Sequence, residues 1–228
     1  MPTSTTTIYC GDSCLIQSWI DSSNVIGFWP FDTSLNDNGN RYNPISSLNR
    51  PTLSTGYIRQ SALFVTSAQQ SIFTPFIPLY NRSFTIEAWI KPTGYPNVKD
   101  HSIVGLCPEE ATNYCLHITV RYGKLYFGFY YNDVQGSTTI ATDQWAHVAF
   151  VYDSVTNMQR IYLNGVLDGE ASVSSALLTT TGNFTIGTNE VMESTTSFLQ
   201  GYIDELSVSG RVKSSCEVLE RATLAARF

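Results

Sequence analysis

Two adjacent carboxylates, Asp204 and Glu205, come nearest to a hydrolytic pair in this 228-residue sequence. Hydrolysis of a glycosidic bond by acid–base chemistry needs two carboxyl groups that flank that bond. The segment Tyr202–Ser209 has the composition of a strand, and successive strand side chains point to opposite faces. No second glutamate lies two positions from either residue. We therefore expect no catalytic residues and no enzyme.

The histidines and serines form no pattern of metal or nucleophilic chemistry. His101, His117 and His147 lack the HxH and HExxH spacings that bring two imidazoles to one zinc ion. No serine lies in a G-x-S-x-G setting, which exposes a nucleophile on a sharp turn. We expect the histidines to be structural.

Tyrosines in the segment Lys124–Tyr131 have the spacing of a platform for a sugar ring. If alternate residues from Leu125 onward face the core, Tyr126 and Tyr130 share the other face, and Gly128 leaves a gap between them. Aromatic rings stack on apolar C–H surface while their hydroxyls form hydrogen bonds. The alternative, that both tyrosines are ordinary strand residues on a half-exposed sheet, stays open at this point.

Composition excludes several classes of protein. The chain is 13% aromatic and only 14% charged, with 13 Lys and Arg against 19 Asp and Glu and a net charge of −6. A nucleic-acid partner is not expected, because cations are scattered and outnumbered. No apolar run is long enough to span a bilayer, so we expect no membrane insertion. The segment Met1–Thr7 is polar and does not read as a signal peptide.

The five cysteines and two glycosylation sequons nevertheless favour an extracellular location. Cys107 and Cys115 bracket a seven-residue loop between two expected strands, which predicts a disulfide across a hairpin. The sequons begin at Asn81 and Asn183, in surroundings rich in Ser and Thr. We expect the chain to be one domain of a longer secreted or cell-surface protein.

Short segments with period-two alternation position these residues. In Phe84–Ile90, alternate apolar side chains share one face, as in a half-buried strand. Trp29, Trp89 and Trp145 lie within such apolar alternations, and we expect them in the core. Turn signals recur about every ten residues: Tyr122-Gly123 indicates a tight hairpin, and Asn164-Gly165 is typical of a type I′ hairpin. The sequence predicts an all-β sandwich.

Helices are expected only near the two ends of the chain. A short helix is expected over Asp12–Ile20. A second helix is expected over Ser214–Phe228, capped by Ser214 or Ser215, with Glu217 in its first turn.

The order of the segments resembles that of the laminin-G-like modules, within the concanavalin A-like lectin/glucanase jelly-roll superfamily. The resemblance covers roughly residues 20 to 215, and no single segment is specific by itself. The segments that carry it are Val25–Asp32, Leu35–Asn40, Ser61–Phe64, Ser83–Pro92, Gln144–Asp153, Ile161–Gly165, Phe184–Gly187 and Gly201–Leu206.

This resemblance implies an antiparallel jelly-roll β-sandwich of two sheets. It divides the chain into an N-terminal extension with Cys10 and Cys14 (1–20), the jelly-roll domain (21–212) and a helical tail (213–228). Because jelly-roll termini tend to lie close together, one N-terminal cysteine, Cys14 or else Cys10, is expected to pair with Cys216.

The resemblance also implies a calcium site. Many members of the superfamily bind Ca²⁺ through loop carboxylates, and Asp32, Asp37 and Asp204 are the corresponding candidates here. Oxygen-rich loops suit this hard cation. The chain departs from the family where Phe64 is followed by Val65 rather than by Asp-Gly. The alternative is that Asp32 and Asp37 only shape turns, by bonding to their own backbone.

The expected function is therefore an extracellular, non-catalytic recognition module for carbohydrate or a glycosylated partner, bound at edge loops or on the concave face. A structural or adhesive protein–protein module is the alternative, and a jelly-roll glycosidase is a distant third. Fold alone cannot choose among them.

Overall fold

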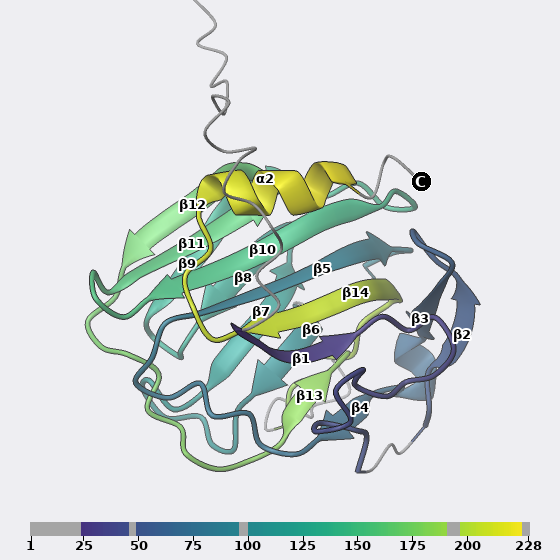
Figure 1. Cartoon of the computed structure of the whole chain (residues 1–228), viewed down its shortest axis with the longest axis horizontal. Helices are drawn as coiled ribbons and strands as arrows, with labels where there is room; N and C mark the ends of the chain where they lie inside the picture. The colour runs from purple at the N-terminus through teal and green to yellow at the C-terminus, as the bar shows by residue number, and fades with distance from the viewer. Residues whose placement is uncertain (1–23, 46–48, 96–99, 191–196, 225–228) are drawn as a thin grey trace, which may run out of the picture.

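Two antiparallel sheets form the protein (Figure 1). The computed structural model describes residues 24–45, 49–95, 100–190 and 197–224. In chain order the strands are β1 (Val25–Trp29), β2 (Thr52–Thr55), β3 (Gln60–Phe64), β4 (Ile72–Thr74), β5 (Phe84–Pro92), β6 (Asp100–Leu106), β7 (Leu116–Arg121), β8 (Lys124–Gly128), β9 (Asp133–Thr139), β10 (Ala146–Asp153), β11 (Met158–Leu163), β12 (Val166–Ser172), β13 (Phe184–Ile186) and β14 (Gly201–Ser209).

The strands divide into a large and a small sheet, which confirms the expected sandwich. Over the described residues, the large sheet has the order β12-β11-β10-β5-β14-β3-β2, with β1 also paired to β14. The small sheet has the order β4-β13-β6-β7-β8-β9. The expected helix over Asp12–Ile20 lies outside the described residues, and the division into domains stays a prediction.

The core lies between the sheets and is rich in aromatic rings. Phe84 on β5 contacts Phe127 of the small sheet edge-on at 6.1 Å and Tyr152 at 5.7 Å, while Trp29 stacks on Phe184 at 5.8 Å. All five side chains are essentially inaccessible to solvent. Each such ring stabilises the fold by roughly 1.5–3 kcal/mol relative to its exposed state, so the paired rings hold the two sheets together.

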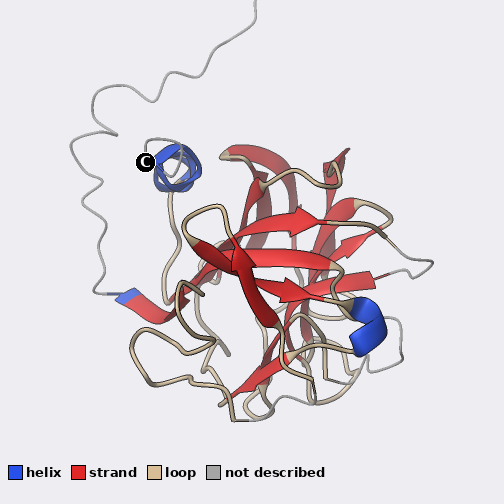
Figure 2. Cartoon of the chain, turned by 90° about the vertical axis from the view of Figure 1, so that its right-hand side faces the viewer, coloured by secondary structure: helices blue, strands red, loops and turns tan. Residues whose placement is uncertain are grey.

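Besides the short 3-10 helix η2 (Thr66–Ala68), the described residues form the α-helix α2 (Ser215–Leu224). Helix α2 lies across the outer face of the large sheet, and Figure 2 shows it end-on beside the strands. Val218 packs on Ala149, Val151 and Tyr162. The N–H of Glu217 donates to Ser214 Oγ at 3.3 Å, and Glu217 Oε2 accepts the N–H of Ser214 at 2.8 Å. This reciprocal capping box begins the helix at the expected place.

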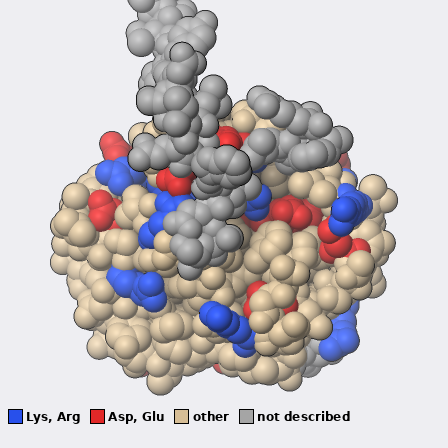
Figure 3. Space-filling model, in the orientation of Figure 1, with Lys and Arg blue, Asp and Glu red and all other residues tan. Residues whose placement is uncertain are grey.

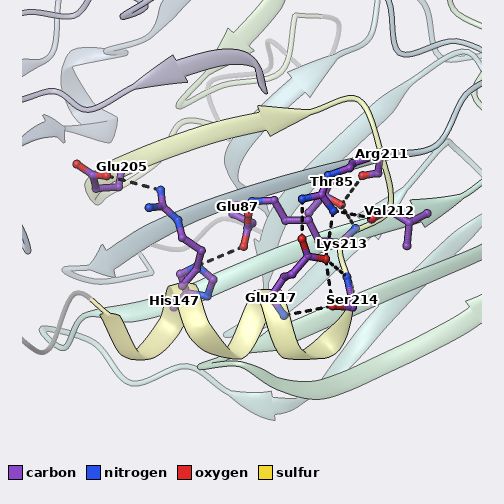
Figure 4. A network of polar contacts seen from close by, with 10 residues as sticks. Thr85, Glu87, His147, Glu205, Arg211, Val212, Lys213, Ser214 and Glu217 are labelled. Atoms are coloured by element: carbon purple, nitrogen blue, oxygen red, sulfur yellow. Dashed lines mark hydrogen bonds and ion pairs between the residues drawn. The ribbon is translucent and has the colours of Figure 1, made fainter. Parts of the chain in front are cut away.

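Partly buried ion pairs attach α2 to the sheet (Figure 4). Lys213 bonds to Glu87, whose side chain is 2% exposed, and Arg221 lies 3.7 Å from Glu205. His147 lies 3.8 Å from Glu87. Burial, together with Arg221 and Lys213, lowers the pKa of His147 to about 3, so the imidazole is neutral. The helix is therefore held by charged contacts as well as by its apolar face.

The disulfide between Cys107 and Cys115 is present, as predicted. Cys216 is disulfide-bonded, whereas Cys10 and Cys14, its expected partners, lie outside the described residues.

Within the described part of the chain, three hairpin turns place two successive residues in the left-handed region. Two of them, Tyr122-Gly123 and Asn164-Gly165, were expected from sequence. The third, Tyr130-Tyr131, has φ values of 69° and 62° and joins β8 to β9. Left-handed backbone costs an ordinary residue roughly 1–2 kcal/mol, so this turn is strained. It also ends β8 at Gly128, three residues before the expected end at Tyr131.

Replacing Tyr130-Tyr131 by Asn-Gly should raise the free energy of unfolding by about 2 kcal/mol, because these residues suit a type I′ turn. Urea denaturation monitored by tryptophan fluorescence measures the change. The control is Tyr114→Asn in the neighbouring loop, which should alter stability by less than about 0.5 kcal/mol. If the Asn-Gly variant were no more stable than the wild type, the conclusion that the Tyr130-Tyr131 turn is strained would be wrong.

Candidate functional site

The candidate site is a cavity of about 660 Å³ at the edge of the large sheet. Its origin lies in β14, which pairs with β3 through residues 201–203 and with β1 through residues 206–209. The cavity opens where the pairing of β14 with β3 ends and its pairing with β1 begins. It is lined by Phe28, Pro30, Asp32, Asn38, Tyr57, Ile58, Arg59 and Glu205.

A β-bulge marks this junction on β14. Glu205 has a φ of 52°, so the alternation of side chains is interrupted there. The expectation that Asp204 and Glu205 face opposite sides of a regular strand is corrected by this bulge. Glu205 lines the cavity, whereas Asp204 is fully buried. Burial raises the pKa of Glu205, and the nearby Asp32 charge acts in the same direction.

Asp204 supports the β2–β3 turn that walls the cavity. Its Oδ2 accepts the N–H of Ile58 at 2.9 Å. A side chain at Gly56 would meet this oxygen at 2.7 Å, so the turn requires glycine. Asp204 therefore positions Tyr57 and Arg59 at the cavity.

Tyr57 connects the cavity to an aromatic cluster on the outer face of the large sheet. Its ring stacks on Trp89 with centroids 3.6 Å apart, and Trp145 lies edge-on at 6.1 Å. Trp145 in turn contacts Tyr202 at 6.0 Å, and Lys91 Nζ lies 4.2 Å from the Tyr202 ring. Tyr57, Trp145 and Tyr202 are half-buried. Such rings offer apolar faces beside hydrogen-bonding groups.

The loop after β1 forms the opposite wall and is organised by Asp37, whose side chain is 2% exposed. Its Oδ1 accepts the N–H groups of Phe28 at 2.9 Å and Gly39 at 3.2 Å. Its Oδ2 accepts those of Arg41 at 2.9 Å and Tyr42 at 3.2 Å. Asp37 therefore shapes the loop, which was the alternative to a metal ligand.

Asp32, Asp37 and Asp204 do not fit a calcium ion. The oxygens of Asp37 are occupied by four donors, Asp204 is enclosed beneath the β2–β3 turn, and Asp32 pairs with Arg59 at 3.2 Å. Among the described residues, no group of three or more His, Cys, Asp or Glu side chains is placed to hold a metal ion. Each of the three candidates is therefore engaged by protein groups in place of a metal ion.

The expected tyrosine platform is also corrected. Tyr126 lies across from Thr119 on β7, flanked by His117, whose ring stacks on it at 5.5 Å, and by Arg121 at 3.9 Å. Its hydroxyl donates to Asp133 at 2.9 Å, and Asp133 also fills the space above Gly128. Tyr130 lies beyond the end of β8, in the strained turn. The two tyrosines therefore share no strand face.

Sequence reasoning missed the aromatic cluster. Trp29 is in the core between the sheets, as expected, and Trp89 is buried at 7% exposure, but neither Trp89 nor Trp145 belongs to the core between the sheets. The alternation of β5 already contained the signal for Trp89, because Ala88 and Ile90 face inward and Trp89 must face outward. Nothing in the sequence marked Tyr57, because its position depends on the turn over Asp204.

Comparison with models of known protein families places the chain in one of them. A laminin G family model, described as the concanavalin A-like lectin/glucanases superfamily, matches residues 66–219, and the chain belongs to this family. Comparison by sequence with curated proteins finds no match. No helix in the described part of the chain has the length and apolar character of a bilayer span.

Solved structures share this fold at low sequence identity. Domain 4 of AbnA, a GH43 extracellular arabinanase from Geobacillus stearothermophilus in complex with arabinotriose, is 21% identical with a TM-score of 0.70, covering 87% of this chain and 98% of that one. The binding domain of Paraclostridial Mosquitocidal Protein 1 is 14% identical (TM-score 0.72; 90% and 53%). A botulinum neurotoxin type C structure, described as dependent on two ganglioside molecules for cell entry, is 14% identical (TM-score 0.68; 89% and 51%). The chain spans about half the length of these two toxin chains.

The substitution Asp204→Asn should make the stability of the protein less dependent on pH. Burial raises the pKa of Asp204 to about 7 in the folded state, whereas an unfolded aspartate titrates near its ordinary value of roughly 3.9. Folding therefore favours the protonated carboxyl, and this stabilisation is present below about pH 4 and lost as the pH rises through 7.

Asparagine keeps an acceptor for the N–H of Ile58 and cannot ionise. The free energy of unfolding of the Asp204→Asn variant, relative to that of the wild type, should therefore increase by roughly 2–4 kcal/mol between pH 4 and pH 8. Urea denaturation of both proteins across this range measures the difference. If the free energy of unfolding depended on pH in the same way in both proteins, the raised pKa of the buried Asp204 would be contradicted.

Proposed function

We propose that the chain is a non-catalytic carbohydrate-binding module that works outside the cell. The observation that carries the proposal is the cavity in which Tyr57, supported by Trp89, lies beside Asp32, Asn38 and Arg59. An aromatic wall beside carboxylate, amide and guanidinium groups matches the alternation of C–H faces and hydroxyls on a sugar. The arabinotriose complex of a similar fold and the Cys107–Cys115 disulfide also support it.

A glycosidase is the second candidate, because Asp32 and Glu205 line the same cavity. Glycoside hydrolysis uses such a pair, one carboxyl group being protonated. In this cavity each carboxylate has an arginine partner: Arg59 for Asp32 at 3.2 Å and Arg221 for Glu205 at 3.7 Å. Burial raises the pKa of Glu205, although Arg221 acts in the opposite direction. Because both carboxylates are held by arginines, the arrangement suits binding better. Release of reducing ends that is lost in Glu205→Gln would establish the enzyme instead.

Tyr57→Ala should weaken binding of a saccharide identified on a glycan array by about tenfold, because a lost aromatic contact costs roughly 1.4 kcal/mol. Tyr57→Phe should bind nearly as well, since it keeps the ring. Titration calorimetry with the selected saccharide measures both. Binding should be equal in millimolar calcium and in chelator, because the three acidic candidates are engaged by protein groups.

The matched control is Tyr122→Ala, an exposed tyrosine at a turn of the small sheet, which should leave affinity unchanged. Equal losses in the Tyr57 and Tyr122 variants would remove the site from this cavity. A blank array, together with a partner captured equally well after deglycosylation, would replace the proposal with protein adhesion.

A further inference from the structure

A second cavity, of about 530 Å³, adjoins the first and shares Phe28 and Asn38 with it. It lies between β1, the loop after it and the residues around α2. Its described lining is Val25, Ile26, Gly27, Phe28, Asp37, Asn38, Gly39, Arg41, Ser207, Lys213 and Arg221. The two cavities share one wall, so a ligand of more than one sugar unit could extend from one into the other.

The charged groups of this second cavity are unusual for an acidic protein. The chain carries only 13 Lys and Arg and a net charge of −6, yet three cations, Arg41, Lys213 and Arg221, line this one space. Figure 3 shows Lys and Arg side chains among the acidic ones on this face of the molecule. Cations gathered in a hollow raise the local concentration of an anionic group.

Asp37 is the one carboxylate in the described lining, and it is not open to a ligand's hydroxyls. Both its oxygens are occupied by the four backbone N–H groups of the loop. Ser207, 4% exposed, supplies a hydroxyl from β14. The groups left to recognise a ligand are therefore mainly hydrogen-bond donors, which suits an oxyanion.

The three cations differ in how they are held. Lys213 is fixed by Glu87, and Arg221 by Glu205, so both occupy set positions on the wall. Arg41 lies in the exposed loop, and the structure shows no carboxylate partner for its guanidinium among the described residues. An unpaired guanidinium beside two fixed cations can receive a carboxylate or a sulfate in bidentate geometry.

We propose that this second cavity binds the anionic group of an acidic saccharide whose neighbouring ring occupies the first cavity. The inference rests on the proposed carbohydrate-binding function and narrows the ligand class to saccharides that bear a carboxylate or a sulfate ester. Arg41 supplies the free guanidinium, while Lys213 and Arg221, each shared with a glutamate, line the wall beside it. Neutral saccharides use the first cavity alone and bind more weakly.

The test is titration calorimetry of the whole chain with three probes: trigalacturonate, a chondroitin sulfate tetrasaccharide and neutral galactotriose. The variants are Arg41→Gln and, as a matched control on the small sheet, Lys124→Gln. Arg41→Gln should weaken the acidic probe that binds by roughly fivefold to twentyfold, because a charge-assisted hydrogen bond is lost. Galactotriose binding should not change, and Lys124→Gln should leave all probes unaffected.

The outcomes separate this inference from the proposed function. A preference for trigalacturonate or for the sulfated probe identifies the anionic group, and that preference should fall between 50 and 300 mM NaCl. Neutral binding equal to acidic binding, or equal losses in Arg41→Gln and Lys124→Gln, would overturn the acidic-saccharide inference while carbohydrate binding stands. Absence of binding for every probe, together with a blank glycan array, would overturn both.

Discussion

The carboxylate of Asp37 is the interaction on which both cavities depend. It binds the N–H of Phe28 on β1 and three N–H groups of the following loop, while the N–H of Asn38 donates to the carbonyl of Phe28 at 2.7 Å. Phe28 and Asn38 are the two residues that the cavities share. Because a buried carboxylate left without these donors would be costly, the loop has one favoured path, and that path forms the common wall.

The outer face of the large sheet divides into two regions with different chemistry. At one end α2 covers Ala149 and Val151 and closes the face with ion pairs. At the other end Trp89 contacts Tyr57, and Tyr202 contacts Trp145. The bulge of β14 lies between these regions, and the charged and aromatic groups meet there. If β14 were a regular strand without the bulge, the first cavity would not open there and Glu205 would not line it.

Much of the architecture could be predicted from local sequence. Alternation in β5 and β10 and the turns at Tyr122-Gly123 and Asn164-Gly165 follow from side-chain period and glycine conformation, and the Ser214 cap follows from helix chemistry. The disulfide also followed from the spacing of its cysteines. These features depend on residues near each other in the chain.

The site could not be predicted in the same way, because its contacts join distant segments. Whether Asp37 binds a metal or four N–H groups depends on how its loop folds against β1. The burial of Asp204 depends on the β2–β3 turn folding over it, 146 residues away in sequence. The predicted pairing of Tyr126 with Tyr130 failed because the chain turns at Tyr130, against the conformational preference of tyrosine.

The pairing of β14 with β1 has a consequence for how the protein folds. β1 is the first strand of the described chain and β14 the last, so their pairing brings together segments about 180 residues apart. Contacts of such sequence separation incur the largest loop-closure entropy and tend to form late. The two cavities therefore exist only in molecules in which β1 has paired with β14. A ligand bound there would stabilise that closure by mass action, slowing the opening of the sandwich at the point where it joins its two ends.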